Sequence, residues 1–392
     1  MAYSKVNDVA AASIAKINDI AVASIAKCND SEAPSTGATR WVIGGDDGVI
    51  AHAANSDRTS WSRYNSVEGG SATGTHDNDF DIAFGKNASG QGIFVCTRNG
   101  GAREVQFSGT DVTSTSAWTD INIDGTGNKR NIMQVQWGAR ADGTAAGTWM
   151  AVGSQVDKEI YRSTDGAANW TAINFTAEGN NPVTGHSNSI FINGIASDGQ
   201  GNWMFGQQDR IYYSTNDGAS FTMSEPFDAG NGKGVPGRQH AIIYTNNSWV
   251  IMYSNSSQIH VRSCAASDIT DWGTEVRLNN LLHMSTNGQK GQMAANSSGR
   301  VVATTNRIEP DLYYFDVNGK TINNDNLVTL SMNNDDILDV ATDGSTWLLA
   351  CEDGDVWEST NDGESWSQIA DNQGADSADD FTSVACDVVL PL

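Results

Sequence analysis

The sequence predicts an all-β fold, and three observations carry that prediction. A short polar phrase that ends in an aromatic residue recurs three times, each time after a run with strand character. Pairs of short apolar runs joined by polar, Gly-rich turns recur along most of the 392-residue chain. The 40 Gly and 6 Pro suit many tight turns between short strands. Repetition of this kind indicates one supersecondary unit repeated around a common core.

The recurring phrase occupies residues 163–170, 214–221 and 359–366, and it has the chemistry of a stapled hairpin. An Asp carboxylate can accept backbone N–H groups inside a tight turn, and the Gly after it tolerates a positive φ. A Ser hydroxyl can close a second bond, and the final aromatic ring can bury itself against neighbouring strands. We assign these structural roles to Ser163, Asp165, Gly166 and Trp170, to Ser214, Asp217, Gly218 and Phe221, and to Ser359, Asp362, Gly363 and Trp366.

Aromatic residues at the same point of weaker copies extend the repeat over most of the chain. They are Trp61, Trp118, Trp170, Phe221, Trp272, Phe315 and Trp366. Their spacings of 57, 52, 51, 51, 43 and 51 residues define seven units. Roughly four to eight four-stranded units of this length are typical of a β-propeller, so the sequence predicts a seven-bladed β-propeller.

Each unit is expected to begin with two strands joined by a turn. The pairs are clearest at residues 79–84 and 92–95, 133–137 and 148–152, 190–195 and 203–205, 240–244 and 249–252, 292–295 and 300–303, and 337–341 and 347–349. The first unit lacks its opening strand, whereas residues 381–387 match an opening strand with no unit after it. We therefore expect the C-terminal strand to complete the first blade and close the ring, which protects the sheet edges.

Residues 1–31 are a different segment, with a period of eleven residues over two and a half copies. The period favours a helix with one apolar stripe, whereas the Asn-Asp steps favour turns, and short helical turns with bends satisfy both. So few copies bury too little to be stable alone, so we expect them to dock on copies of themselves or on another protein. Residues 32–39 are expected to be a linker to the ring of residues 40–392. The proposed docking residues are Val6, Val9, Ile14, Ile17, Ile20 and Ile25.

Composition narrows the classes of partner. The 23 basic and 47 acidic residues give a net charge of −24, which repels nucleic-acid backbones, so nucleic acid is not an expected partner. The five Cys contain no CxxC pair and no His/Cys group has zinc spacing, so no cofactor is predicted. The acidic turn at residues 45–48 leaves the binding of a calcium ion as an open alternative. Neither a signal peptide nor a transmembrane run is predicted, as in a protein made in a reducing cytoplasm.

Two resemblances suggest a function. The three phrases resemble the Asp box of sialidase-like repeats, and residues 5–30 resemble repeats of the type Ser-Ile-Ala-Lys-x-Asn-(Gly/Asp) at the amino termini of structural proteins of tailed bacteriophages. Together they imply a non-enzymatic virion protein that is made in the host cytoplasm and is oligomeric in the particle. Residues 1–31 would bind other virion proteins, and the propeller would be displayed on the tail, neck or capsid for assembly or for contact with a host-surface glycan or protein.

The first resemblance also implies an alternative, a propeller that binds or cleaves glycans. A sialidase pairs a Tyr nucleophile with a carboxylate and clamps its substrate with three Arg. The predicted inner strands contain no Arg, and the family's Arg-Ile-Pro phrase is replaced by Arg-Trp-Val at residues 40–42. Paired Asp residues, as in xyloglucan-cleaving propellers, are the other possibility, and the inner-strand candidates are Asp81, Asp339 and Asp387. We assign no catalytic residue.

Overall fold

The chain divides into two compact units, Met1–Thr39 and Arg40–Leu392. The computed structural model describes residues 5–6, 9–10, 16–17 and 20–21 of the first unit. In the second it describes residues 40–45, 49–65, 81–97, 105–108, 112–114, 117–121, 123, 132–155, 159–174, 190–207, 210–224, 239–255, 258–282, 291–305, 311–332, 336–371 and 381–390. No helix within these ranges is long and apolar enough to cross a membrane.

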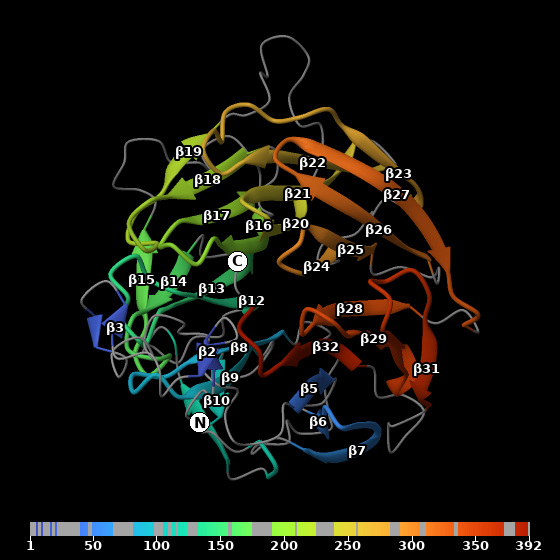
Figure 1. The fold of residues 1–392 in the computed structure, drawn as a ribbon, viewed down its shortest axis with the longest axis horizontal. Coiled ribbons are helices and arrows are strands. Elements are labelled where there is room, and N and C mark those ends of the chain that lie inside the picture. The colour runs from blue at the N-terminus through green and yellow to red at the C-terminus, as the bar shows by residue number, and fades with distance from the viewer. Residues whose placement is uncertain are drawn as a thin grey trace. The chain divides into compact units, whose positions relative to one another are not determined.

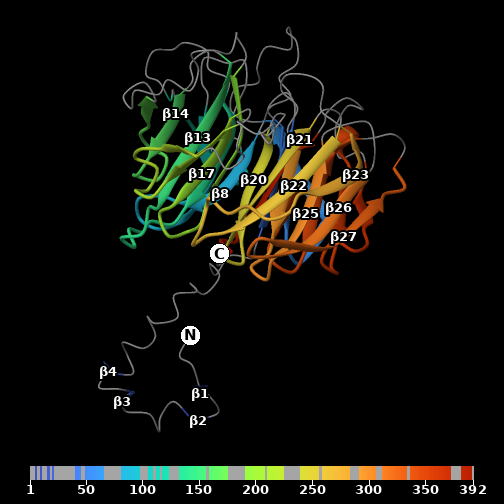
Figure 2. The ribbon, with the colours of Figure 1, turned by 90° about the horizontal axis from the view of Figure 1, so that it is seen from above.

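The second unit is a ring of antiparallel sheets set radially, which is the architecture of a β-propeller (Figures 1 and 2). Five of its sheets have four strands each, and the first strand named below is the innermost in Figure 1. They are β32 (Phe381–Cys386), β5 (Arg40–Gly45), β6 (Val49–Ala54) and β7 (Asp57–Asn65); β8 (Ile82–Lys86), β9 (Gly92–Thr97), β10 (Val105–Ser108) and β11 (Trp118–Ile121); β20 (Gln239–Thr245), β21 (Ser248–Asn255), β22 (Gln258–Ala265) and β23 (Val276–Leu282); β24 (Gly291–Ala295), β25 (Arg300–Thr305), β26 (Asp311–Asn318) and β27 (Thr321–Thr329); and β28 (Ile337–Thr342), β29 (Trp347–Cys351), β30 (Val356–Ser359) and β31 (Ser367–Ala370), with the 3₁₀ turn Glu352–Gly354 after β29.

The sixth sheet corrects the predicted number of blades. It contains eight strands, namely β12 (Ile132–Gly138), β13 (Thr148–Gln155), β14 (Glu159–Ser163), β15 (Thr171–Asn174), β16 (Ile190–Ser197), β17 (Trp203–Gln207), β18 (Arg210–Ser214) and β19 (Thr222–Ser224). Strand β13 continues beyond its ladder with β12, and its residues Ser154 and Gln155 pair with Phe191 and Ile190 of β16. Two of the expected four-stranded units therefore form one sheet. The ring has six blades among the described residues, and the prediction of seven is wrong.

Closure by the chain's end is confirmed. Strand β32 pairs antiparallel with β5, with Cys386 opposite Trp41 and Val384 opposite Ile43. The last described strand of the sequence therefore completes the first sheet, as predicted from the lack of an opening strand before residues 40–43.

Large aromatic side chains fill the wedges between sheets. Five Trp side chains, each in the second strand from the centre, are fully buried: Trp41, Trp149, Trp203, Trp249 and Trp347. Apolar clusters span neighbouring sheets, as where Trp249 of β21 packs with Met204 of β17. Burial of these large rings contributes the main stabilisation between the radial sheets.

The first unit contains short hairpins. Strand β1 (Lys5–Val6) pairs with β2 (Val9–Ala10), and β3 (Lys16–Ile17) pairs with β4 (Ile20–Ala21) in the same register eleven residues later. The helix favoured by the period is therefore wrong for these residues. By sequence, Asn-Asp separates each pair of strands, and that dipeptide suits a two-residue hairpin connection. Val6, Val9, Ile17 and Ile20 lie in these strands. Ile14, Ile25, residues 32–39 and most of the acidic turn at 45–48 lie outside the described residues.

Candidate functional site on the inner strands

Asp339 of β28 sits in a buried polar cluster on the innermost strands. Its Oδ1 accepts the N–H of Val340 at 2.8 Å. Its Oδ2 accepts the N–H of Val384 at 2.8 Å and the hydroxyl of Ser383 at 2.9 Å, both from β32. Asp339 and Ser383 are buried, so these bonds form in a medium that strengthens them.

The same contact recurs from one inner strand to the next. In each case a side-chain oxygen on one inner strand accepts a backbone N–H from the next inner strand. The donor is the residue that directly follows the position aligned with the acceptor. The links run from Val384 to Asp339 at 2.8 Å, from Ile82 to Ser383 at 3.0 Å, from Val135 to Asp81 at 2.8 Å, and from Ile195 to Gln134 at 2.9 Å. They tie β28, β32, β8, β12 and β16 together around part of the ring.

Local backbone irregularity aims these side chains. The ladders shift register immediately before Asp339, Ser383 and Gln134. A β-bulge adds a residue to one strand and redirects the side chains beside it. In β16 the equivalent residue is Gly194, which has a φ of +97° and whose added Cβ would lie 2.7 Å from the backbone N of Ile242. There the two backbones approach each other directly, without a bridging side chain.

The electrostatics of the cluster single out Asp339. Burial, followed by the charge of Asp81, raises the pKa of Asp339 to about 7, against the lowering effect of its hydrogen bonds to Val384, Val340 and Ser383. Asp81 is 7% exposed and its Oδ2 holds the N–H of Val135. Both carboxylates therefore hold backbone amides of neighbouring inner strands.

The third candidate, Asp387, is not part of this cluster. It follows β32, and its Oδ1 accepts the N–H of Arg40 at 2.8 Å while its own N–H donates to the Arg40 carbonyl at 3.0 Å. Burial raises its pKa. Asp387 thus fixes the start of β5 beside the end of β32, and the structure brings only Asp81 and Asp339 together.

The eight-residue phrases do form stapled turns, but with a different division of roles. The Ser at the first position accepts the N–H of the fifth residue, as Ser359 does from Gly363 at 3.0 Å. The third residue accepts the N–H of the seventh, as Asp165 does from Asn169 at 2.9 Å. In the later copies this third residue is Asn, so Asn216 and Asn361 take the role that we assigned to Asp217 and Asp362.

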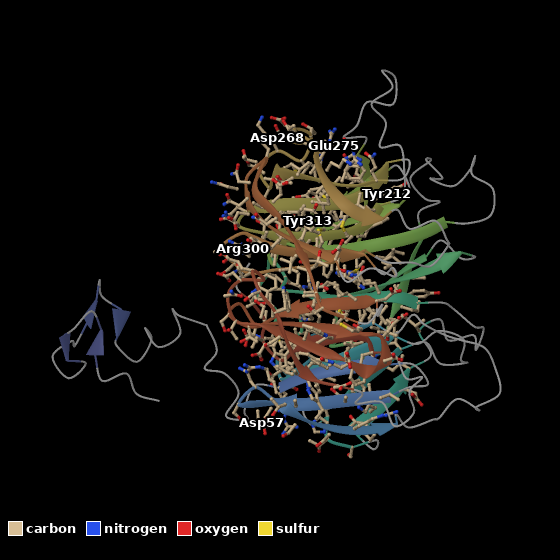
Figure 3. The ribbon with its side chains drawn as sticks, turned by 90° about the vertical axis from the view of Figure 1, so that its right-hand side faces the viewer. Asp57, Tyr212, Asp268, Glu275, Arg300 and Tyr313 are labelled. Atoms are coloured by element: carbon tan, nitrogen blue, oxygen red, sulfur yellow. The ribbon has the colours of Figure 1, made fainter. Side chains whose placement is uncertain are left out.

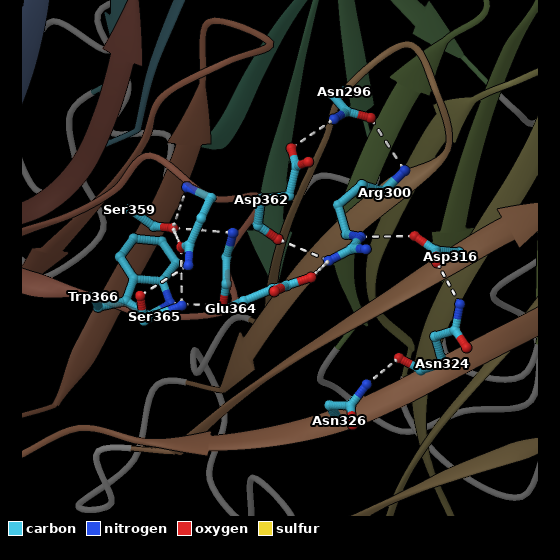
Figure 4. A network of polar contacts seen from close by, with 12 residues as sticks. Asn296, Arg300, Asp316, Asn324, Asn326, Ser359, Asp362, Glu364, Ser365 and Trp366 are labelled. Carbon is cyan, nitrogen blue, oxygen red and sulfur yellow. Dashed lines mark hydrogen bonds and ion pairs between the residues drawn. The ribbon is translucent and has the colours of Figure 1, made fainter.

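The carboxylate of Asp362 instead faces the four-stranded sheet that precedes it in the chain (Figure 4). Asp362 Oδ1 accepts from the side-chain amide of Asn296 at 3.3 Å, and Arg300 donates to the Asp362 carbonyl at 3.0 Å. Arg300 also bonds Asp316 Oδ1 at 2.7 Å and lies 4.8 Å from the ring centre of Tyr314. Each phrase therefore staples its own turn and also locks it to a neighbour.

The turns of the other two phrases also contact the preceding unit. Arg162 Nε donates to the Asp217 carbonyl at 2.7 Å. A Cβ added at Gly166 would lie 2.2 Å from the backbone N of Ala88, so this turn also abuts the preceding sheet. Asp57, Asp268 and Arg300 lie on one side of the ring (Figure 3), and Arg300 bonds the turn that contains Asp362.

A second titratable cluster lies on β21, β22 and the residue before β23. The Tyr253 hydroxyl of β21 donates to Glu275 Oε2, His260 Nδ1 of β22 lies 3.0 Å from Glu275 Oε1, and Arg262 Nη2 lies 3.5 Å from Glu275 Oε2. Burial raises the pKa of Tyr253 and lowers that of His260. Tyr253 and His260 are 1% and 5% exposed, whereas the side chains of Glu275 and Arg262 are partly exposed.

Sequence reasoning missed several of these residues. Gln134 and Ser383 differ in type from Asp81 and Asp339, so no shared letter marks the inner-strand position. For Asn216 and Asn361 a signal existed, because each stands two residues after the Ser of its phrase. Among the described residues, no group of three or more His, Cys, Asp or Glu side chains could hold a metal ion.

Comparison with known proteins adds support for the fold alone. No protein-family model matches the chain, and no curated protein does. A chain of the mitotic checkpoint complex is similar with a TM-score of 0.51 and 10% identity, over 81% of this chain and 82% of that chain. YCF48 from Cyanidioschyzon merolae gives 0.48 and 15%, over 74% and 84%. The β-propeller domain of Cps50 (Swd1) from Myceliophteria thermophila gives 0.47 and 8%, over 82% and 93%. At such identities the likeness concerns only the architecture.

Proposed function

We propose that this chain is a non-enzymatic structural protein of a bacteriophage particle, in which residues 1–31 dock and the ring is displayed. The observation that carries the non-enzymatic part is the use of the inner-strand carboxylates: Asp81 and Asp339 hold backbone amides of neighbouring strands. Groups committed in this way rigidify a platform and are poorly placed to meet a substrate. The phage assignment rests on the resemblance of the N-terminal repeat.

A particle-incorporation assay tests the docking part. Tagged full-length chain, a chain lacking residues 1–31, and a chain with residues 5–30 in shuffled order would each be expressed in cells that assemble the particle. Of these three chains, only the full-length one is expected in the purified particles. Thermal unfolding of the three chains controls for an intact ring. Equal incorporation of the deleted or shuffled chain would contradict the docking role, and absence of the full-length chain would contradict the virion assignment.

Glycan cleavage is the second candidate, and one observation favours it. Tyr253, Glu275 and Arg262 are the residue types that a sialidase combines, and the Tyr hydroxyl bonds the carboxylate. Their place away from the innermost strands and the burial of Tyr253 count against it. Incubation of the purified chain with sialylated and β-glucan substrates, with a Tyr253→Phe variant as the control, decides the matter. Sugar release that is lost in the variant would replace the structural proposal.

A further inference from the structure

Strand β32 closes the ring, and it is held from both sides. On one side its backbone pairs with β5. On the other, Asp339 of β28 accepts both the N–H of Val384 and the hydroxyl of Ser383. The Ser383 oxygen in turn accepts the N–H of Ile82, which joins β32 to β8. One carboxyl group therefore fastens the closing strand to the sheet that precedes it in the ring.

The surroundings of Asp339 supply a like charge. Asp81 is the charged group whose field acts on Asp339 among the described residues. The other titratable groups on the elements around this carboxyl are Asp336 beside β28, Cys351 on β29, Cys386 on β32, Lys86 on β8 and Arg300 on β25. Arg300 is occupied by Asp316 and Asp362. A buried carboxylate that faces another carboxylate is destabilised in its ionised form.

We propose that Asp339 is a proton-sensitive latch on ring closure, which holds β32 more firmly when its carboxyl group is protonated than when it is ionised. A proton on Asp339 reverses the direction of its hydrogen bond with Ser383, so that the carboxyl donates to the Ser383 oxygen. That oxygen has a second lone pair and keeps the N–H of Ile82. Protonation thus removes the cost of holding a charge in a buried site and the repulsion by Asp81, while the link from β32 to β8 remains.

The sign of the effect follows from linkage. The pKa of Asp339 rises from 3.8 in the unfolded chain to about 7 in the folded one. The stability that the folded state gains from this group is complete below the unfolded value and is lost as pH rises through the folded value. Between about pH 5.5 and about pH 8.5, linkage predicts that the opening of β32 becomes about 30-fold more favourable.

Cys386 reports the opening of β32. It is buried, its Sγ lies 3.4 Å from the Thr342 carbonyl oxygen, and burial raises its pKa to about 12. Cys264 of β22 is an internal reference, because burial raises its pKa to about 12 as well. In a Cys28→Ser chain, the rate of N-ethylmaleimide labelling at each Cys would be followed by mass spectrometry. Each rate is divided by the rate for the unfolded chain at the same pH.

The expected result is a rise of about 30-fold in the labelling of Cys386 relative to Cys264 between about pH 5.5 and about pH 8.5. Asp339→Asn should abolish this rise. Asp311→Asn is the matched control, since Asp311 is a buried carboxylate in another sheet that bonds Thr329 at 2.5 Å, and the rise should persist there. A flat ratio in the parent chain, or an undiminished rise in Asp339→Asn, would overturn the proposal.

Asp81→Asn keeps the proposal testable if Asp339→Asn fails to fold. The amide oxygen can still accept the N–H of Val135, while the charge that acts on Asp339 is gone. The pKa of Asp339 then falls, although burial still raises it, so part of the loosening moves to lower pH. The rise between the two pH values should shrink. An undiminished rise in this variant would count against the latch.

Discussion

Replacement of Gly194 by Ala tests the close approach of neighbouring inner strands. Gly194 has a φ of +97°, and a Cβ added there would lie 2.7 Å from the N of Ile242 and 2.9 Å from two backbone atoms of Ala241. The positive φ costs Ala about 1–2 kcal/mol. Overpacking against backbone that cannot rotate away adds about 1–3 kcal/mol. Gly194→Ala should therefore lower the free energy of unfolding by about 4 kcal/mol.

Gly143 provides the matched control. It also has a positive φ, +71°, but an added Cβ would meet nothing within 4 Å. Gly143→Ala should therefore cost only the backbone part, about 1–2 kcal/mol. Urea unfolding followed by Trp fluorescence, with equal m-values checked first, gives both numbers. Losses that agree within about 0.5 kcal/mol would refute the inferred approach of β16 to β20.

Substitutions at two further positions test the polar contacts that join neighbouring elements. Arg300→Met should cost about 1–3 kcal/mol, because the carbonyl of Asp362 and the carboxylate of Asp316 lose their donor while the aliphatic stem stays. Arg300→Lys should restore only part of this, since one ammonium lacks the fork of a guanidinium, and full restoration would contradict the reasoning. Asp387→Ala should speed hydrogen exchange at the Arg40 amide at least tenfold, because this N–H loses its acceptor. Unchanged exchange, measured by mass spectrometry, would contradict the role of Asp387 in holding the start of β5.

Local features of the fold could be predicted from the sequence, and the count of sheets could not. Residues 337–341 and 347–349 were expected to be paired strands and form β28 and β29, because alternating apolar residues around a Gly-containing turn specify a hairpin locally. The lack of an opening strand before residues 40–43, together with the matching strand at residues 381–387, predicted the closure. The joining of two units depends on two residues at the end of β13, and nothing in their type marks them.

The polar contacts between sheets were harder to predict, for a physical reason. The staple within each turn is local, so the phrase itself specifies that Ser359 bonds Gly363. The partner of Asp362 lies on another sheet, and its identity depends on the angle and height at which two sheets meet. The inner-strand links likewise accept an Asp, a Ser or a Gln, because any side-chain oxygen of suitable reach can take a backbone N–H.

The closing role of β32 is tested most directly by removing it and giving it back. A chain that lacks residues 379–392 would be compared with the full chain by urea unfolding, before and after addition of a peptide of those residues. We expect the truncated chain to unfold at a lower urea concentration than the full chain and the peptide to restore most of the difference, with a Ser383→Ala peptide less effective than the parent peptide. A truncated chain that unfolds at the same urea concentration as the full chain would contradict the account.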